Sequence, residues 1–197
     1  MGVIFLLRFG LRNRNSSGAC AASITIVRVV FMSNVVSRPM SCLPAKLESI
    51  SSEGPLSEAA VDAVIAIAMA AANIAIVIRF RNADAALGAV SGNANVDGDD
   101  QKALDIIADE MIQNALSEVK AVASYLSEEQ DAAVQINDDG KVIVASDPLD
   151  GSSNIDCNVS TGTIFGVYKR MPGNTPGTED VLRPGKELIA AGYCMYG

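Results

Sequence analysis

The longest hydrophobic stretch of the chain has the pattern of a helix. Residues 57–79 predict one long helix with Ser57 as its N-cap, and the segment 63–78 is apolar except for Asn73. A membrane-spanning helix needs about 20 apolar residues in succession. This segment is shorter, consists mostly of Ala and Ile, and follows Asp62. We therefore expect a helix buried between layers of a soluble protein, with no membrane as partner.

A second helix is predicted over residues 99–119, followed by strands. The apolar face of this helix is expected to consist of Leu104, Ile107, Ala108, Met111 and Ala115. The expected strands cover residues 121–126, 132–136, 141–146, 161–168 and 188–196. Asn137 to Gly140 predicts a hairpin between the second and third strands, and residues 171–185, rich in Pro and Gly, predict a surface excursion. The order of elements indicates an α/β protein with helices packed on a mixed sheet.

Charge separates residues 1–50 from the rest. They hold six basic residues and one acid, whereas the whole chain has 15 basic and 23 acidic residues and a net charge of −8. This basic leader, rich in Ser and Arg, is typical of a transit peptide. The alternative is a start site assigned too early, upstream of Met32, which would add noncoding sequence. The expected compartment is the cytoplasm or a plastid, and the leader composition favours the plastid slightly.

Composition also excludes several kinds of chemistry. The chain has no histidine, which excludes Ser-His-Asp and Cys-His catalysis and His-ligated zinc. Its four cysteines form no CxxC pair, so we expect neither a disulfide framework nor a thiolate metal site. The acidic balance disfavours nucleic acid as a partner. Carboxylates, hydroxyls, lysine or thiols must therefore carry any catalysis.

The candidate metal-binding and phosphate-binding residues follow directly after the strand expected at 141–146. Pro148 fixes one backbone torsion, so Asp147 and Asp150 bracket a tight turn and converge. With the Leu149 carbonyl, expected to be exposed at the bend, they offer the hard oxygen ligands that Mg²⁺ or Mn²⁺ prefers. The next three residues are small, and their N–H groups can hold a phosphate: Gly151, Ser152 and Ser153.

A second acidic pair, Glu128 and Glu129, follows the strand expected at 121–126 and can reach the same site. Adjacent acids are usually solvated, as is a helix acid such as Asp105. Carboxylates beside a phosphate cradle, however, need divalent cations to invert the local field. The combination favours metal-assisted phosphoryl transfer over an ordinary acidic turn.

Five strings of this sequence resemble fructose-1,6-bisphosphatases. They are NVDGDDQKALDIIADEM from Asn95, SEE from Ser127, DPLDGSSNID from Asp147, VSTGTIFGVY from Val159 and AAGYCMYG from Ala190. DPLDG alone would indicate the wider group of lithium-sensitive, metal-dependent sugar phosphatases, and the continuation SSNID narrows the resemblance to the fructose enzyme. The resemblance covers about residues 57–197. It implies a layered sugar-phosphatase fold, of which this chain has the N-terminal part.

The resemblance implies Mg²⁺-dependent hydrolysis of the 1-phosphate of fructose 1,6-bisphosphate to fructose 6-phosphate and phosphate, in gluconeogenesis or the Calvin cycle. Mn²⁺ or Zn²⁺ are the implied substitutes for Mg²⁺. The matching metal ligands are Glu128, Asp147, the Leu149 carbonyl and Asp150, with Glu129 and Asp99 supporting a further metal or the attacking water. Asp105 and Glu129 match the catalytic acids that activate this water. The groups that match the 1-phosphate site are Asp150, Gly151, Ser152 and Ser153.

Departures from the family limit what the resemblance implies. The family's second half, which completes the metal and 6-phosphate sites, is missing from 51–197, so we expect weak or no turnover by this chain alone. A full-length relative would be a homotetramer. The alternatives are a catalytically silent homologue that folds or pairs with full-length subunits, and a sibling phosphatase for another sugar or polyol phosphate. Residues 58–62 and Val142 differ from the AMP-responsive members, so we expect no AMP inhibition.

Overall fold

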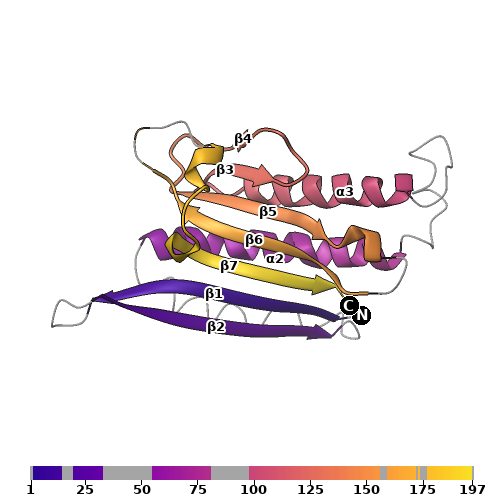
Figure 1. The fold of residues 1–197 in the computed structure, drawn as a ribbon, viewed down its shortest axis with the longest axis horizontal. Helices are drawn as coiled ribbons and strands as arrows, with labels where there is room; N and C mark the ends of the chain where they lie inside the picture. Colours follow the sequence, from indigo (N-terminus) through magenta and orange to yellow (C-terminus); the bar gives the residue numbers. More distant parts are fainter. Residues whose placement is uncertain are drawn as a thin grey trace.

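Two helices cover one face of a mixed sheet (Figure 1). The computed structural model of the chain describes residues 2–14, 20–32, 55–80, 98–155, 159–171, 173 and 177–196, with side chains from residue 58 onward except those of 98–102. The helices are α2 (Pro55–Phe80) and α3 (Gly98–Ser117). The described strands lie in the order β2-β1-β7-β6-β5-β3-β4. This arrangement confirms the predicted α/β class.

The strands of the sheet include two for which the sequence predicts no element. Their bounds are β1 (Gly2–Arg14), β2 (Cys20–Met32), β3 (Val122–Ser127), β4 (Val134–Gln135), β5 (Val142–Asp150), β6 (Thr161–Lys169) and β7 (Leu188–Tyr196). β1 and β2 pair with each other, and β1 also pairs with β7. The division of the chain at residue 50 into a leader and a phosphatase portion stays a prediction.

Helix α2 begins at Pro55, two residues before the predicted N-cap, Ser57. Proline suits the first turn of a helix because its missing N–H would have no partner there. One face of α2 is buried, and the face opposite to it is exposed at Met69 and Ile76. The helix is therefore covered on one side rather than enclosed between two layers. By length and composition alone, Glu58–Phe80 could cross a membrane, and half of its most apolar window is buried inside the protein. The most buried residues on the buried face of α2 are Ala60, Ala63, Val64, Ile67, Ala68, Ala71 and Ile74.

Helix α3 forms where the sequence predicts it, but its most buried face is rotated. The buried apolar residues are spaced four apart, at Leu104, Ala108, Ile112 and Leu116. The other members of the predicted face are only half-buried, namely Ile107, Met111 and Ala115. The rotation follows from packing against both α2 and the sheet. It leaves Asp105 in contact with Ser152, just beyond the end of β5.

The predicted hairpin between residues 132–136 and 141–146 is wrong. Strand β4 pairs antiparallel with one edge of β3, and β5 pairs parallel with the other edge. The expected turn still forms, because the Gly140 N–H donates to the Asn137 carbonyl over 3.0 Å and the Asn137 side chain donates to the Lys120 carbonyl over 2.6 Å. The chain thus crosses the start of β3, and β3 and β5 end at the same edge of the sheet.

A β-bulge takes the place of the tight turn predicted at Pro148. The pairing of Asp147 and Asp150 with β6 leaves one extra residue on β5. A bulge tolerates proline, which donates no hydrogen bond, and the Pro148 carbonyl accepts a 2.7 Å hydrogen bond from the Thr163 hydroxyl. The chain turns only afterwards, at Gly151, whose φ of 76° is left-handed and favours glycine.

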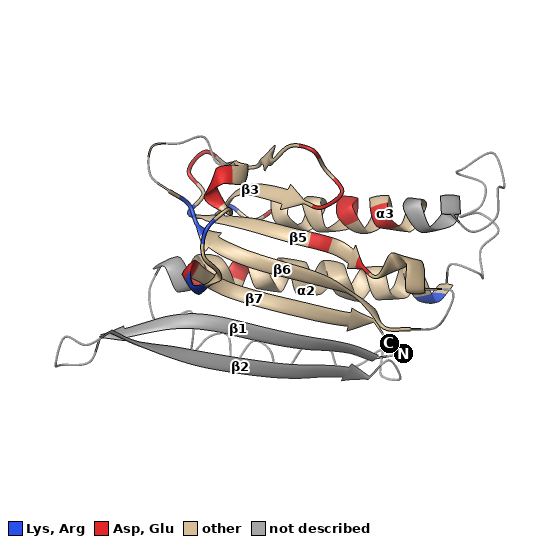
Figure 2. Ribbon diagram, in the orientation of Figure 1, with Lys and Arg blue, Asp and Glu red and all other residues tan. Residues whose placement is uncertain are grey.

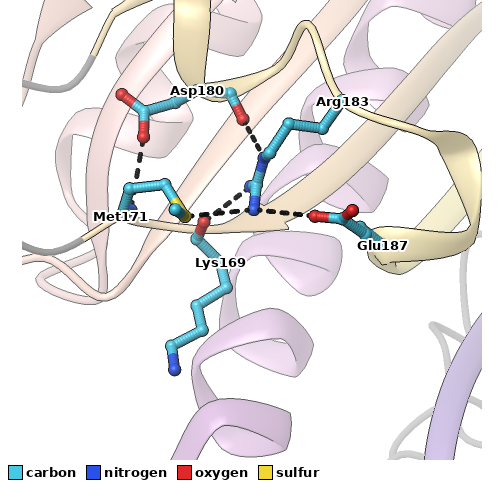
Figure 3. Close-up of polar contacts among 5 residues, drawn as sticks. All are labelled: Lys169, Met171, Asp180, Arg183 and Glu187. Carbon is cyan, nitrogen blue, oxygen red and sulfur yellow. Dashed lines mark hydrogen bonds and ion pairs between the residues drawn. The ribbon is translucent and has the colours of Figure 1, made fainter.

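Arg183 closes the excursion between β6 and β7 (Figure 3). Its guanidinium donates to the Lys169 carbonyl over 2.7 Å and to the Asp180 carbonyl over 2.5 Å, and it pairs with Glu187 at 3.4 Å. It also lies over the Tyr168 ring, 5.1 Å from the centroid. Arg183 therefore ties the described part of the excursion to the end of β6, together with Asp180 Oδ1, which accepts a 3.2 Å hydrogen bond from the Met171 N–H.

Candidate active site

The end of β5 carries three of the predicted metal ligands, Asp147, Asp150 and the carbonyl of Leu149, a residue that is buried rather than exposed as predicted. Asp147 is half-buried, and Asp150 is exposed beyond the bulge. The Leu149 N–H donates a 3.1 Å hydrogen bond to Asp147 Oδ1 and so orients this carboxylate. Burial raises the pKa of Asp147, the Leu149 hydrogen bond opposes this shift, and the charge of Asp150 adds to it. The two carboxylates therefore lie close enough to repel each other.

The turn after β5 connects these acids to α3. Ser152 opens a short 3₁₀ helix (Ser152–Asn154), and its hydroxyl donates a 3.2 Å hydrogen bond to Asp105 Oδ2. The other oxygen, Asp105 Oδ1, is buried and has no hydrogen-bond partner among the described residues. A buried polar atom without a partner costs about 1–3 kcal/mol. A proton, a cation or a ligand donor at this position would remove that cost.

Glu128 and Glu129 follow β3 at the same edge of the sheet. Because β3 and β5 are parallel neighbours with Ser127 paired to Ser146, their carboxyl ends meet there. The Glu128 N–H donates to the Ser146 carbonyl over 3.0 Å, and the Glu129 N–H donates to Ser127 Oγ over 3.2 Å. Figure 2 shows acidic residues on α3, on the end of β5 and in the loop after β3. Three elements thus contribute acids to one region.

Burial and mutual repulsion both raise the pKa values of these acids. Partial burial, followed by the charge of Asp105 and then by Glu128, raises the pKa of Glu129 to about 7. Burial also raises the pKa of Asp105, where the Ser152 hydrogen bond opposes the shift and the charge of Glu128 adds to it. Clustered carboxylates of this kind bind a proton or a cation more readily than isolated ones.

The donor set suits a hard divalent cation, although the described side chains do not close around one point. All the predicted ligands are oxygens, as Mg²⁺ prefers, and the orphaned Asp105 Oδ1 marks where charge is uncompensated. Among the described side chains, no three acidic, cysteine or histidine groups lie close enough to share a metal ion. The backbone of Asp99 lies in the first turn of α3, and its side chain lies outside the described residues.

A buried polar cluster next to these acids is not predicted from the sequence. The Tyr125 hydroxyl donates to Asp109 Oδ1 over 2.9 Å and lies 2.9 Å from Ser146 Oγ. Gln130 Nε2 donates to Asp109 Oδ2 over 2.5 Å and to Gln113 Oε1 over 2.8 Å. The strand pattern marks Tyr125 only as an apolar position. Its partners lie 16 and 21 residues away, and no local spacing rule connects them.

The sequence of the chain is similar to those of known proteins. The family model described as fructose-1-6-bisphosphatase, N-terminal domain, matches residues 50–197. The chain is 47% identical over 110 residues to the cytosolic fructose-1,6-bisphosphatase of Brassica napus, covering 55% of this chain and 32% of that protein. Fructose-1,6-bisphosphatase 1 of Bos taurus is 46% identical over the same length, with the same shares covered.

The fold agrees with the sequence match. The crystal structure of Leishmania major fructose-1,6-bisphosphatase in holo form has a TM-score of 0.62 and 31% identity, covering 77% of this chain and 48% of that chain. The matched region spans about a third of the length of the curated relatives. Since the family model covers most of the chain, including all the predicted site residues, the chain belongs to the fructose-1,6-bisphosphatase family.

Proposed function

We propose that the site hydrolyses the 1-phosphate of fructose 1,6-bisphosphate with the help of Mg²⁺. The observation that carries this proposal is the convergence of mutually repelling acids from α3, β5 and the loop after β3 beside the orphaned Asp105 Oδ1. Such a cluster needs a cation before a phosphate can approach it. Membership of the family supports the sugar bisphosphate as substrate.

The chain's own residues supply the ligands and the base. Glu128, Asp147, the Leu149 carbonyl and Asp150 would hold Mg²⁺, or Mn²⁺ or Zn²⁺ in its place, with Glu129 and Asp99 supporting a further ion. Bound cations would neutralise the phosphate and the negative charge that develops during transfer.

Asp105 would take the proton from the attacking water, because a carboxylate with a raised pKa is the better base. Ser152 orients this carboxylate through its hydrogen bond to Oδ2. The water oxygen bonds to phosphorus, the phosphorus–oxygen bond to the sugar breaks, and the sugar oxygen takes up a proton from a solvent water to leave as an alcohol. Asp105 then returns to solvent the proton that it took. Gly151, Ser152 and Ser153 would hold the phosphate beside Asp150 at the turn.

The wider context of the activity is also a proposal. The chain spans about a third of the curated relatives, so the complete site and a homotetramer would need the remaining part of such a protein. The same observation favours the second candidate, a catalytically silent homologue that pairs with full-length subunits. The Brassica napus relative is named as cytosolic, which favours the cytoplasm over plastid import. A substrate panel separates fructose 1,6-bisphosphate from other sugar or polyol phosphates.

The substitution Asp147→Asn tests the proposal directly. Loss of a ligand should weaken Mn²⁺ binding in calorimetry by more than about tenfold, since removing even a partner that only orients a ligand costs about 10–100-fold. Mg²⁺-dependent phosphate release should fall with it. The matched control is Asp139→Asn, which removes the same charge from an exposed turn before the start of β5. Equal Mn²⁺ affinity in both variants would remove the metal site, and with it the proposed function.

A further inference from the structure

The buried cluster around Tyr125 is a complete hydrogen-bond network. Tyr125 is fully buried, and its single proton goes to Asp109 Oδ1. The Ser146 hydroxyl, 2.9 Å away, must therefore be the donor to the tyrosine oxygen. Gln130 uses its amide group on the other oxygen, Asp109 Oδ2, and on Gln113. Both oxygens of the buried Asp109 thus have a partner.

Three residues of this network lie next to a candidate ligand or base. Ser146 immediately precedes Asp147 on β5, and Gln130 immediately follows Glu129 in the loop after β3. Asp109 lies four residues after Asp105 on α3, which places the two acids one helical turn apart. The Tyr125 hydroxyl therefore joins the two elements that carry Asp105 and Asp147, and through Asp109 it also holds the loop of Glu129.

The loop of the two glutamates is fixed at both ends by this arrangement. At its start, the Glu128 N–H donates to the Ser146 carbonyl, on the same residue whose hydroxyl meets Tyr125. At its end, the Gln130 side chain binds Asp109. Apart from these contacts, both glutamates are exposed and their side chains are long. The other described hydrogen bonds of the loop are local, from the Glu129 N–H to Ser127 Oγ and from the Gln130 N–H to the Ser127 carbonyl, whereas the two anchors tie the loop to β5 and α3.

We propose that Asp109, Tyr125, Gln130 and Ser146 form a positioning network that sets the separation of the site's acids, with the Tyr125 hydroxyl at its centre. The proposal rests on the proposed cation-dependent function, because the separation matters only if the acids share a cation. Tyr125 does not touch the reacting groups and is a positioning residue. Its effect is on the affinity of the site for the cation. A satisfied buried network is rigid, whereas a half-satisfied one is costly.

The test is Tyr125→Phe in the full chain, which removes the hydroxyl and keeps the ring. Mn²⁺ affinity, measured by calorimetry and by electron paramagnetic resonance, should fall by about 10–100-fold, as for other residues that orient metal ligands. Hydrogen exchange of the Glu128 amide in the metal-free protein should become faster, because its Ser146 anchor is loosened. The matched control is Ser124→Ala on the same strand, because the Ser124 hydroxyl is buried and has no hydrogen-bond partner among the described residues.

A second variant keeps the proposal testable if Tyr125→Phe does not fold. Gln130→Ala releases only the half-buried end of the loop, and it should weaken Mn²⁺ binding without loss of cooperative melting. Lower melting temperature with unchanged Mn²⁺ affinity in these variants would assign the network to fold stability alone and overturn the proposal. Failure of the unsubstituted chain to bind Mn²⁺ at all would instead refute the proposed function, and the positioning role with it.

Discussion

Tyr193 reaches the site region by crossing a neighbouring strand over a glycine. A Cβ atom on Gly162 would lie 2.6 Å from Tyr193 Cζ and 2.6 Å from the Cys194 carbonyl oxygen, both closer than real contacts. Gly162 is paired across the sheet with Asp150. Burial, and then the charge and hydrogen bond of Asp150, raises the pKa of Tyr193. The missing side chain at position 162 is thus what allows the tyrosine to approach this acid.

The substitution Gly162→Ala should therefore be destabilising. The added methyl group meets backbone as well as the ring, and overpacking of this kind costs about 1–3 kcal/mol. Urea denaturation would measure the loss in the free energy of unfolding. Gly185→Ala is the control, because a Cβ there meets nothing within 4 Å, and its change should stay within about 0.5 kcal/mol. Equal midpoints for the two variants would contradict the close approach of Tyr193 to Gly162.

For individual residues, the sequence predicts those parts of the site whose members are close together along the chain. The acids at 147 and 150 and the small residues after them share one short segment, so their common location follows from chain connectivity. The network of Asp109 and Tyr125 does not, because each residue is ordinary in its own helix or strand. Their contact depends on how α3 lies on the sheet. The roles of the individual acids stay predictions.

Among the elements, helices are easier to predict than strand pairing. The apolar period of α2 and α3 is a local signal, and both helices form within two residues of their predicted ends. The hairpin prediction failed because a turn shows that the chain reverses, not which strand edge it meets. Residues 134–135 and 142–150 take opposite edges of β3. The pairing depends on the whole sheet, in which β3 lies between β4 and β5.

The excursion between β6 and β7 should depend strongly on Arg183. Arg183→Ala removes the bonds to the Lys169 and Asp180 carbonyls, and a hydrogen bond to a charged group contributes about 1.5–3 kcal/mol. We expect faster limited proteolysis within residues 171–185 and unchanged Mn²⁺ affinity. Lys186→Ala, at an exposed position, is the control. Equal cleavage rates in the two variants would show that other contacts hold the excursion.

For the molecule as a whole, the acids work against folding when no cation is present. The chain carries a net charge of −8, and its acids are brought together rather than spread out. Among the described side chains, the carboxyl groups with raised pKa values are Asp62, Asp105, Glu129 and Asp147. A carboxyl group whose pKa is higher in the folded chain binds its proton more tightly there. The folded state therefore prefers these groups protonated, or neutralised in another way.

The stability of the metal-free chain should fall as the pH rises from about 4.5 to about 7. Glu129 has an ordinary pKa of 4.5 and a folded value of about 7, so its contribution is complete below the first value and is lost as the pH passes the second. Thermal melting at several pH values would measure this decline.

Mg²⁺ at saturating concentration should raise the melting temperature most at pH 8, where the acids are charged, and little at pH 4.5. The variant Asp147→Asn should show a smaller gain from Mg²⁺, because one ligand is gone. A gain from Mg²⁺ that is the same at both pH values would mean that the ion binds away from these acids, since only their ionisation links it to pH.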